Sequence, residues 1–167
     1  MIVVANAGPL IALAQINYFD LLRLLYGELY IPLAVREEVV SSGQTHPGAV
    51  EVNSADWIHI AEVRDTTAVQ LLRDRLDAGE SEAIVLAIEM KADLLLIDEA
   101  RGRRIAEARG LRKTGTVGML IVAKRRGLIR AVTPLLDRLL ASGFRMNDEL
   151  YRIARILADE ERPEDRV

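Results

Sequence analysis

Apolar residues run without interruption through two short segments of the chain, 2–5 and 94–97. Such runs are typical of strands that a parallel sheet buries on both faces. Weaker patterns predict further strands at 28–31, 57–63 and 111–113, with 57–63 at an edge, and a turn-rich loop at 41–48. Apolar residues at helical spacing predict helices that begin near 9 and 77 and others at about 18–26, 33–40, 67–76, 99–108, 117–126, 133–141 and 148–159.

The alternation of strands and helices predicts an α/β fold, a three-layer α/β/α sandwich with a mainly parallel central sheet. A length of 167 residues suits one domain, which we place at 1–159, with a charged tail at 160–167. Because parallel crossovers are right-handed, the carboxyl ends of the first and central strands should meet at one edge of the sheet. Those ends are Asn6 and Asp98.

The stretch DAGESEAIVLAIEMKADLLLIDE, from Asp77 to Glu99, organises the rest of the chain. Asp77 and Glu80 have the spacing of a capping box, which marks the start of a helix. The strand that follows this helix ends in two carboxylates, Asp98 and Glu99. Ligand sites of open α/β sheets lie at the carboxyl ends of strands, so the pattern favours chemistry at Asp98.

Scarce residue types exclude several kinds of site. The chain has no cysteine and two histidines, His46 and His59, which excludes disulfides and thiolate zinc sites and argues against a histidine-based triad. The apolar start, 1–13, lacks the basic residues that open a secretory signal. No uncharged apolar run approaches the roughly 20 residues that span a bilayer. We therefore expect a cytoplasmic protein without a membrane segment.

Positive charge is concentrated in one part of a chain whose formal net charge is −3. Between Arg101 and Arg130, ten lysines and arginines accompany a single acid, Glu107. A basic segment close to carboxylates fits a polyanionic substrate whose reaction uses metal ions. A solvated helix face would produce the same pattern, so both interpretations stay open at this point.

Four positions are candidates for a shared site at the strand ends: Asn6, Glu38, Glu82 and Asp98. Oxygen ligands without histidine or cysteine are the set that Mg²⁺ or Mn²⁺ selects. A bound divalent cation would relieve the repulsion between the carboxylates and activate a water. Each residue also has a structural interpretation: Glu82 suits a helix dipole and Asp98 a helix cap. Likewise, Glu38 suits an exposed ion pair and Asn6 a turn.

Four stretches follow one another in the order of a known protein family: VVANAGPLIALAQI, YIPLAVREEVV, LDAGESEAIVLAIEMKADLLLIDEARGRRIA and GLRKTGTVGMLIVAKRRGLI. They span nearly the whole chain and resemble the PIN-domain family, specifically its VapC-like prokaryotic branch. The resemblance implies a metal-dependent ribonuclease fold, with acids at the positions of Asn6, Glu38, Glu82 and Asp98. Many relatives are toxins restrained by a small antitoxin, and many form dimers.

The sequence departs from the family pattern at the end of the first strand. The family usually has an aspartate there, followed by threonine or serine, whereas this chain has Asn6, Ala7 and Gly8. An asparagine can ligate a metal through its carbonyl oxygen but brings no charge. Thr114 and Thr116 stand near the position at which many relatives carry a further acid. The departure implies weaker metal binding or an impaired nuclease.

We therefore expect an endoribonuclease that hydrolyses RNA with Mg²⁺ or Mn²⁺, in which Glu80 or Glu99 is an auxiliary acid that orients the attacking water. The basic residues expected to hold the RNA backbone are Arg101, Arg103, Arg104 and Lys113. The expected partners are RNA, a small antitoxin and a second copy of the chain. The alternative is a catalytically impaired PIN-like module that binds RNA or a protein partner, and a metal-binding assay separates the two.

Overall fold

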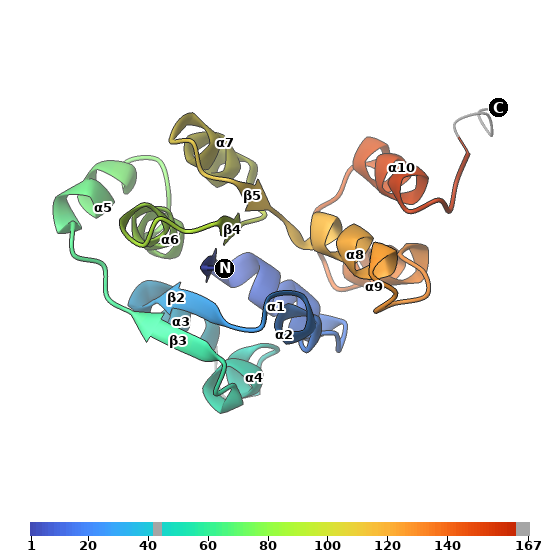
Figure 1. The fold of residues 1–167 in the computed structure, drawn as a ribbon, viewed down its shortest axis with the longest axis horizontal. Helices are drawn as coiled ribbons and strands as arrows, with labels where there is room; N and C mark the ends of the chain where they lie inside the picture. Colours follow the sequence, from blue (N-terminus) through green and yellow to red (C-terminus); the bar gives the residue numbers. More distant parts are fainter. Residues whose placement is uncertain (42–44, 163–167) are drawn as a thin grey trace.

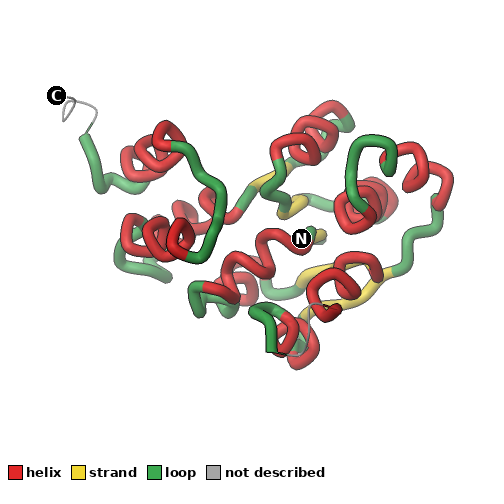
Figure 2. Tube along the Cα trace, turned by 180° about the vertical axis from the view of Figure 1, so that it is seen from behind, coloured by secondary structure: helices red, strands yellow, loops and turns green. Residues whose placement is uncertain are grey.

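The computed structural model describes residues 1–41 and 45–162. Its centre is a five-stranded sheet with the strand order β3-β2-β1-β4-β5, in which every pair of neighbouring strands is parallel. The strands are β1 (Val3–Ala5), β2 (Leu29–Pro32), β3 (Ile58–Ala61), β4 (Leu94–Leu96) and β5 (Lys113–Thr114). Helices surround this sheet, as Figures 1 and 2 show from opposite sides. The α/β sandwich predicted from the sequence is thereby confirmed.

Within the described residues, two helices follow each of the first three strands, one helix follows the fourth strand, and three helices follow the fifth. They are α1 (Ala7–Gln15), α2 (Leu21–Tyr26), α3 (Leu33–Ser41), α4 (Ala49–Ser54), α5 (Thr66–Leu72), α6 (Ala78–Glu89), α7 (Ala100–Ala108), α8 (Thr116–Arg125), α9 (Thr133–Ala141) and α10 (Asp148–Leu157). The sequence pattern did not predict α4, which follows the expected loop at 41–48; residues 42–44 of that loop lie outside the described residues.

Strand β1 is the middle of the core. Val3, Val4 and Ala5 are completely buried although successive side chains point to opposite faces of the sheet. Both faces of β1 are therefore covered, as its uninterrupted apolar sequence predicts. The edge strand β3 is only partly buried, in agreement with the edge position expected for 57–63.

The sheet has a topological switch point between β1 and β4. From β1 the chain proceeds through β2 and β3 on one side, then crosses to β4 on the other side. In register, Ala5 lies opposite Leu96, and the Asn6 backbone N–H donates to the Leu96 carbonyl at 2.9 Å. Asn6 and Asp98 therefore follow neighbouring strands at the same edge, as expected, and this is where open α/β sheets bind their ligands.

The last helices form a group at one side of the sheet, where α8, α9 and α10 lie together in Figure 1. Glu160 secures this group, since its carboxylate accepts from the backbone N–H groups of Val132, at 2.8 Å, and Thr133. Lys124 contributes a hydrogen bond to the Ala158 carbonyl. Glu160, the first residue of the expected charged tail, is thus tied to the start of α9; residues 163–167 lie outside the described part.

Among the helices of residues 1–41 and 45–162, none is both long enough and apolar enough to span a membrane.

Candidate functional site

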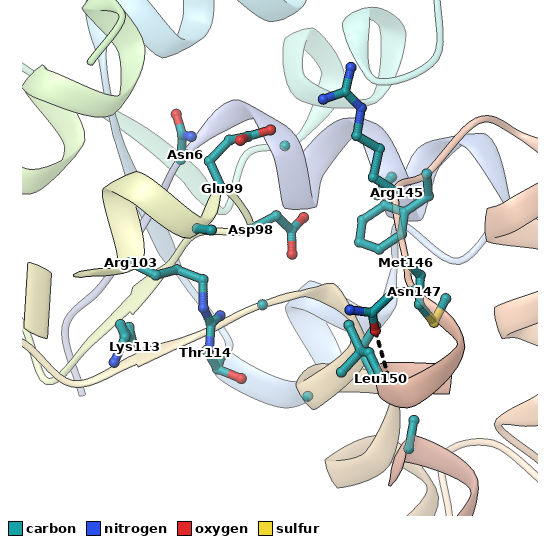
Figure 3. Close-up of a pocket in the computed structure, with 18 of the residues that line it drawn as sticks. Asn6, Asp98, Glu99, Arg103, Lys113, Thr114, Arg145, Met146, Asn147 and Leu150 are labelled. Atoms are coloured by element: carbon teal, nitrogen blue, oxygen red, sulfur yellow. Dashed lines mark hydrogen bonds between the residues drawn. The ribbon is translucent and has the colours of Figure 1, made fainter. Parts of the chain in front are cut away.

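A cleft of about 1230 Å³ opens at the carboxyl ends of β1 and β4. Figure 3 shows Asp98, Glu99, Arg103 and Lys113 on one side of this cleft, which we call the acidic-basic wall. The opposite side is formed by the connection between α9 and α10 and by the start of α10, which we call the far wall; its residues include Phe144, Arg145, Met146, Asn147 and Leu150. The cleft therefore joins the predicted strand-end site to a surface from the end of the chain.

Asp98 is held in place by a single residue at the start of α8. The backbone N–H and the hydroxyl of Thr116 each donate to one carboxylate oxygen of Asp98, both at 2.7 Å. Gly115 makes this approach possible, because a Cβ atom at that position would lie 2.6 Å from Asp98 Oδ1. Burial raises the pKa of Asp98, and the Thr116 hydrogen bonds and the charge of Arg103 offset part of that effect. The carboxylate is thus fixed in orientation before any ligand arrives.

Within the part of the chain that the structure describes, the side chain of Asn6, unlike that of Asp98, is not held by a hydrogen bond to its oxygen. Its side chain is 5% exposed, and Oδ1 accepts no hydrogen bond from any described residue. Asn6 occupies the N-cap position of α1, yet its side chain makes no capping hydrogen bond. An asparagine at an N-cap normally satisfies a free N–H group of the helix. A buried polar oxygen without a partner is costly and calls for an explanation, such as an ion.

Glu38 reaches the same place from α3. A Cβ atom at Gly79, in the first turn of α6, would lie 2.6 Å from Glu38 Oε2 and 3.4 Å from Asn6 Oδ1. The glycine therefore leaves a space into which both oxygens project. Partial burial of the carboxylate and the charge of Asp77 raise the pKa of Glu38.

Glu80 is the acid of α6 that turns toward this region. The predicted capping box is present: Asp77 accepts from the Glu80 N–H at 2.8 Å, and Glu80 Oε2 accepts from the Asp77 N–H at 3.3 Å. The residue is 6% exposed, and Oε1 has no partner among the described residues. Burial and the charge of Asp77 raise the pKa of Glu80, with smaller contributions from Glu99 and Glu38. The charge of Glu99 also contributes to the raised pKa of Asp98, so Glu99 acts on both acids.

Glu82 is not brought together with these residues. Its Oε2 accepts from the backbone N–H of Ala34 at 3.0 Å, in the first turn of α3. The side chain lines a second, smaller cleft of about 280 Å³, together with residues that include Leu33 and Glu62. Two positions along a helix correspond to about 200° of rotation, so Glu80 and Glu82 necessarily face different neighbours. Glu82 thus contributes its charge to the start of α3, where the helix dipole favours it.

Three of the four basic residues predicted to bind RNA line the cleft: Arg103, Arg104 and Lys113. Arg103 is anchored by a hydrogen bond of 3.0 Å to the Ile97 carbonyl, and Lys113 pairs with Glu107 at 3.1 Å. Arg101 instead donates to the Arg75 carbonyl at 3.1 Å and does not line the cleft. The α7 helix therefore directs part of its positive charge toward the acids and part away from them.

The sequence does not predict two components of the site, the contact of Thr116 with Asp98 and the far wall. The sequence places Thr116 near the position of a further acid in the family, but a hydroxyl at a helix start does not reveal which carboxylate it will bind. The far wall comes from a segment more than 40 residues beyond Asp98, and no local pattern relates the two. The sequence does predict a helix at 148–159, and Asn147, the residue before it, caps this helix.

The donors at this edge of the sheet fit a hard divalent cation. Within the described residues, no three acidic or histidine side chains form a ready-made metal cage. Mg²⁺, however, keeps several waters and needs one or two carboxylates together with substrate phosphates. Asn6 Oδ1 and Glu80 Oε1, two of the buried oxygens that lack a partner among the described residues, are of the type that such an ion prefers.

The sequence was also compared with known proteins. The sequence model of one family, described as PIN domain, matches residues 2–160. The match extends from β1 to Glu160, the residue that caps α9, and so includes both walls of the cleft. No curated protein matches the chain.

Proposed function

The chain belongs to the PIN-domain family, and from this premise we propose that it is a metal-dependent endoribonuclease whose reaction takes place in the cleft beside Asp98. Proteins of this family are in general nucleases that use divalent metals, which assigns a nuclease-type hydrolase function to the chain. The finer statement, an RNA substrate with Mg²⁺ or Mn²⁺, is our proposal. The VapC-like resemblance of the sequence supports RNA rather than DNA.

One observation carries the proposal: within the described residues, a pre-oriented carboxylate and a buried oxygen without a partner end the two strands at the switch point, and a second such oxygen belongs to Glu80 in the first turn of α6. Asp98 is fixed by Thr116, and Asn6 Oδ1 and Glu80 Oε1 are among the buried side-chain oxygens that have no hydrogen-bond partner in the described part of the chain. These three residues would hold the cation, with Glu38 beside Asn6 at Gly79. Glu82, expected at the sequence level to be a ligand, caps α3 instead, so Glu80 takes its place in the proposed set.

The bound cation would lower the pKa of a water and offset the charge that develops on the phosphate. The protein's own groups do the rest. Asp98 keeps its orientation through Thr116, and Glu99, which is exposed and lines the cleft, would orient an incoming water. Arg103 and Arg104 would contact phosphates on the α7 side of the reacting one, which positions a nucleic acid without reading its sequence.

A specific feature of the cleft favours a second candidate, a module that binds a protein partner. Leu150, Ile153 and Leu157 of α10 line the cleft, and each is about 40% exposed or more. An apolar helix face of this kind is typical of a surface that accepts an amphipathic segment. The partner would be a small antitoxin, as the VapC-like resemblance suggests, and a homodimer is proposed on the same ground.

The proposal is tested by incubating a mixed RNA pool with the protein in Mg²⁺, in Mn²⁺ and in a chelator. Asp98→Asn should lower cleavage by about a hundredfold, a usual loss when an essential electrostatic group is removed. The fold should persist, because the Thr116 hydroxyl can donate or accept. Asp74→Asn, at an exposed position outside the cleft, is the matched control. Equal cleavage by Asp98→Asn and the parent would contradict the proposal.

A further inference from the structure

The far wall carries polar groups that the proposed reaction does not use. We infer that Arg145 and Asn147 are substrate-positioning residues, which hold the nucleic-acid strand on the side of Asp98 opposite Arg103 and Arg104. The inference rests on the proposed function and adds to it a second wall from the end of the chain. The strand would then cross the cleft from α7 to the start of α10, over the acids.

Arg145 is the first observation. It is exposed, lines the cleft, and makes no hydrogen bond or ion pair with any residue in the described part of the chain. Two other arginines that contact the end of the chain have partners: Arg155 pairs with Glu161 at 2.9 Å, and Arg125 donates to the Leu157 carbonyl at 3.1 Å. Arg145 therefore presents an uncommitted guanidinium to the cleft, and this group binds phosphates particularly well.

The backbone places Arg145 there. Helix α9 ends at Ala141, and Gly143 has a φ of +92°, a conformation that residues with a side chain rarely adopt. This turn directs the following residues back toward the strand ends, so that Figure 3 shows Arg145 across the cleft from Asp98 and Glu99. The position of the guanidinium is thus a consequence of how α9 ends.

Asn147 is the second, independent observation. Its Oδ1 accepts from the Leu150 N–H at 2.8 Å, which caps α10. The hydrogen bond fixes the plane of the carboxamide, and Figure 3 shows the amide nitrogen turned into the cleft. A single asparagine therefore stabilises the helix with one atom and offers a fixed donor to the cleft with another.

The floor between the walls completes the argument. We use this name for the apolar lining that α1 and α8 contribute, which consists of Ile11, Ala12, Val117 and Ile121. Phe144 and Met146 extend this apolar surface into the far wall. Cationic groups at both sides of an apolar floor suit a strand whose phosphates bind at the rims and whose bases face inward. A protein segment would use the same floor, but it would need acidic residues at both rims to satisfy the arginines.

The first test uses fluorescence anisotropy of a labelled single-stranded RNA of mixed sequence, in a chelator so that no cleavage occurs. Arg145→Gln should weaken binding about fivefold, as for an exposed charge contact, and reduce the slope of log K against log salt by about 0.7. Arg145→Lys should retain the slope. The matched control is Arg130→Gln, at an exposed position outside the cleft, which should leave both values unchanged.

The second test separates the roles of two side-chain atoms of Asn147, the oxygen that caps α10 and the amide nitrogen that faces the cleft. Asn147→Asp keeps the acceptor that caps α10, because aspartate and asparagine cap equally well, but it removes the donor and adds a negative charge. The melting temperature should therefore stay the same while RNA binding weakens about fivefold or more. Asn53→Asp, at an exposed position of α4, adds the same charge elsewhere and should bind RNA as the parent does.

The outcomes distinguish this inference from the function on which it rests. If the parent cleaves RNA but Arg145→Gln and Asn147→Asp bind it with parental affinity and salt slope, the far wall is not part of the strand path, whereas the nuclease proposal stands. If the parent neither binds nor cleaves RNA, both fail and the protein-binding candidate gains support. Weaker binding with an unchanged melting temperature and an increased KM establishes the positioning role.

Discussion

The two strands that meet at the switch point end in different ways. At the end of β4, Asp98 accepts two hydrogen bonds from Thr116, and its carboxylate has one fixed orientation. At the end of β1, Asn6 is more deeply buried than Asp98, but its side-chain oxygen has no partner among the described residues. The two positions are neighbours, since the Asn6 N–H donates to the Leu96 carbonyl.

One half of the site is therefore rigid while the other half stays open to a ligand. A fully satisfied carboxylate resists reorientation, whereas an unsatisfied buried oxygen makes the folded state less stable than it would be with a ligand bound. Glu80 belongs with Asn6 in this respect, because its Oε1 also lacks a partner in the described part of the chain. We interpret the β4 end as the preorganised half of the site and the β1 end, with Glu80, as the half that a cation completes.

The largest effect is expected from disrupting the preorganised half. Thr116→Val removes the hydroxyl that donates to Asp98 Oδ2 and leaves a partly buried carboxylate oxygen without that partner. The free energy of unfolding should fall by about 1–3 kcal/mol, and cleavage should fall with it as Asp98 loses its fixed orientation. Urea unfolding measures the first quantity. Thr67→Val, at an exposed position of α5, should remain within about 0.5 kcal/mol of the parent. An equal change in both variants would show that Thr116 does not hold the carboxylate.

A smaller effect, a gain in stability, is expected in the half of the site that a cation completes. The pKa of Glu80 is raised by burial and by Asp77, so the folded state binds its proton more tightly than the unfolded state does. At neutral pH the ionised carboxylate therefore destabilises the fold. Glu80→Gln keeps a capping-box residue and should raise the melting temperature in a chelator, while removing most of the stabilisation by Mn²⁺. The gain should disappear as the pH falls through the raised pKa.

Glu82→Gln is the matched control for that comparison. The amide oxygen can still accept from the Ala34 N–H, and the lost charge at the start of α3 should cost only about 0.3–1 kcal/mol. Stabilisation by Mn²⁺ and cleavage should remain parental. A loss of metal response in Glu82→Gln, with none in Glu80→Gln, would reverse our assignment of the two acids.

The sequence predicted those features that depend on local pattern and on the rules of parallel sheets. The apolar runs at 2–5 and 94–97 identified β1 and β4, and the handedness rule placed Asn6 and Asp98 at one edge. The spacing of Asp77 and Glu80 identified the start of α6, where the capping box is present. Each of these features is determined within a few residues or by a rule that holds for the whole fold class.

The remaining features depend on packing that no local pattern encodes. Glu80 and Glu82 are two residues apart in one helix, and only the neighbours of α6 decide which of them faces the strand ends. Arg101 and Arg103 present the same ambiguity in α7. The far wall, with Arg145 and Asn147, depends on where the turn at Gly143 sends the chain. Contacts of this kind are set by the tertiary structure.

The central claim is that a divalent cation binds the oxygens without partners among the described residues, at the β1 end and on Glu80. The variant Asn6→Asp tests this claim most directly. Two unit charges 4 Å apart interact by about 4 kcal/mol at an effective dielectric of 20, and repulsion from neighbouring carboxylates offsets part of the gain. We expect metal binding tighter by about one to two powers of ten.

The measurement is thermal melting of the parent and of Asn6→Asp, each in a chelator and in saturating Mg²⁺. We predict that the metal-free variant melts below the parent, because it adds a charge next to Glu38, and that Mg²⁺ raises its melting temperature more than that of the parent. Identical melting of the two proteins in both conditions would contradict the account and leave Asn6 as a turn residue.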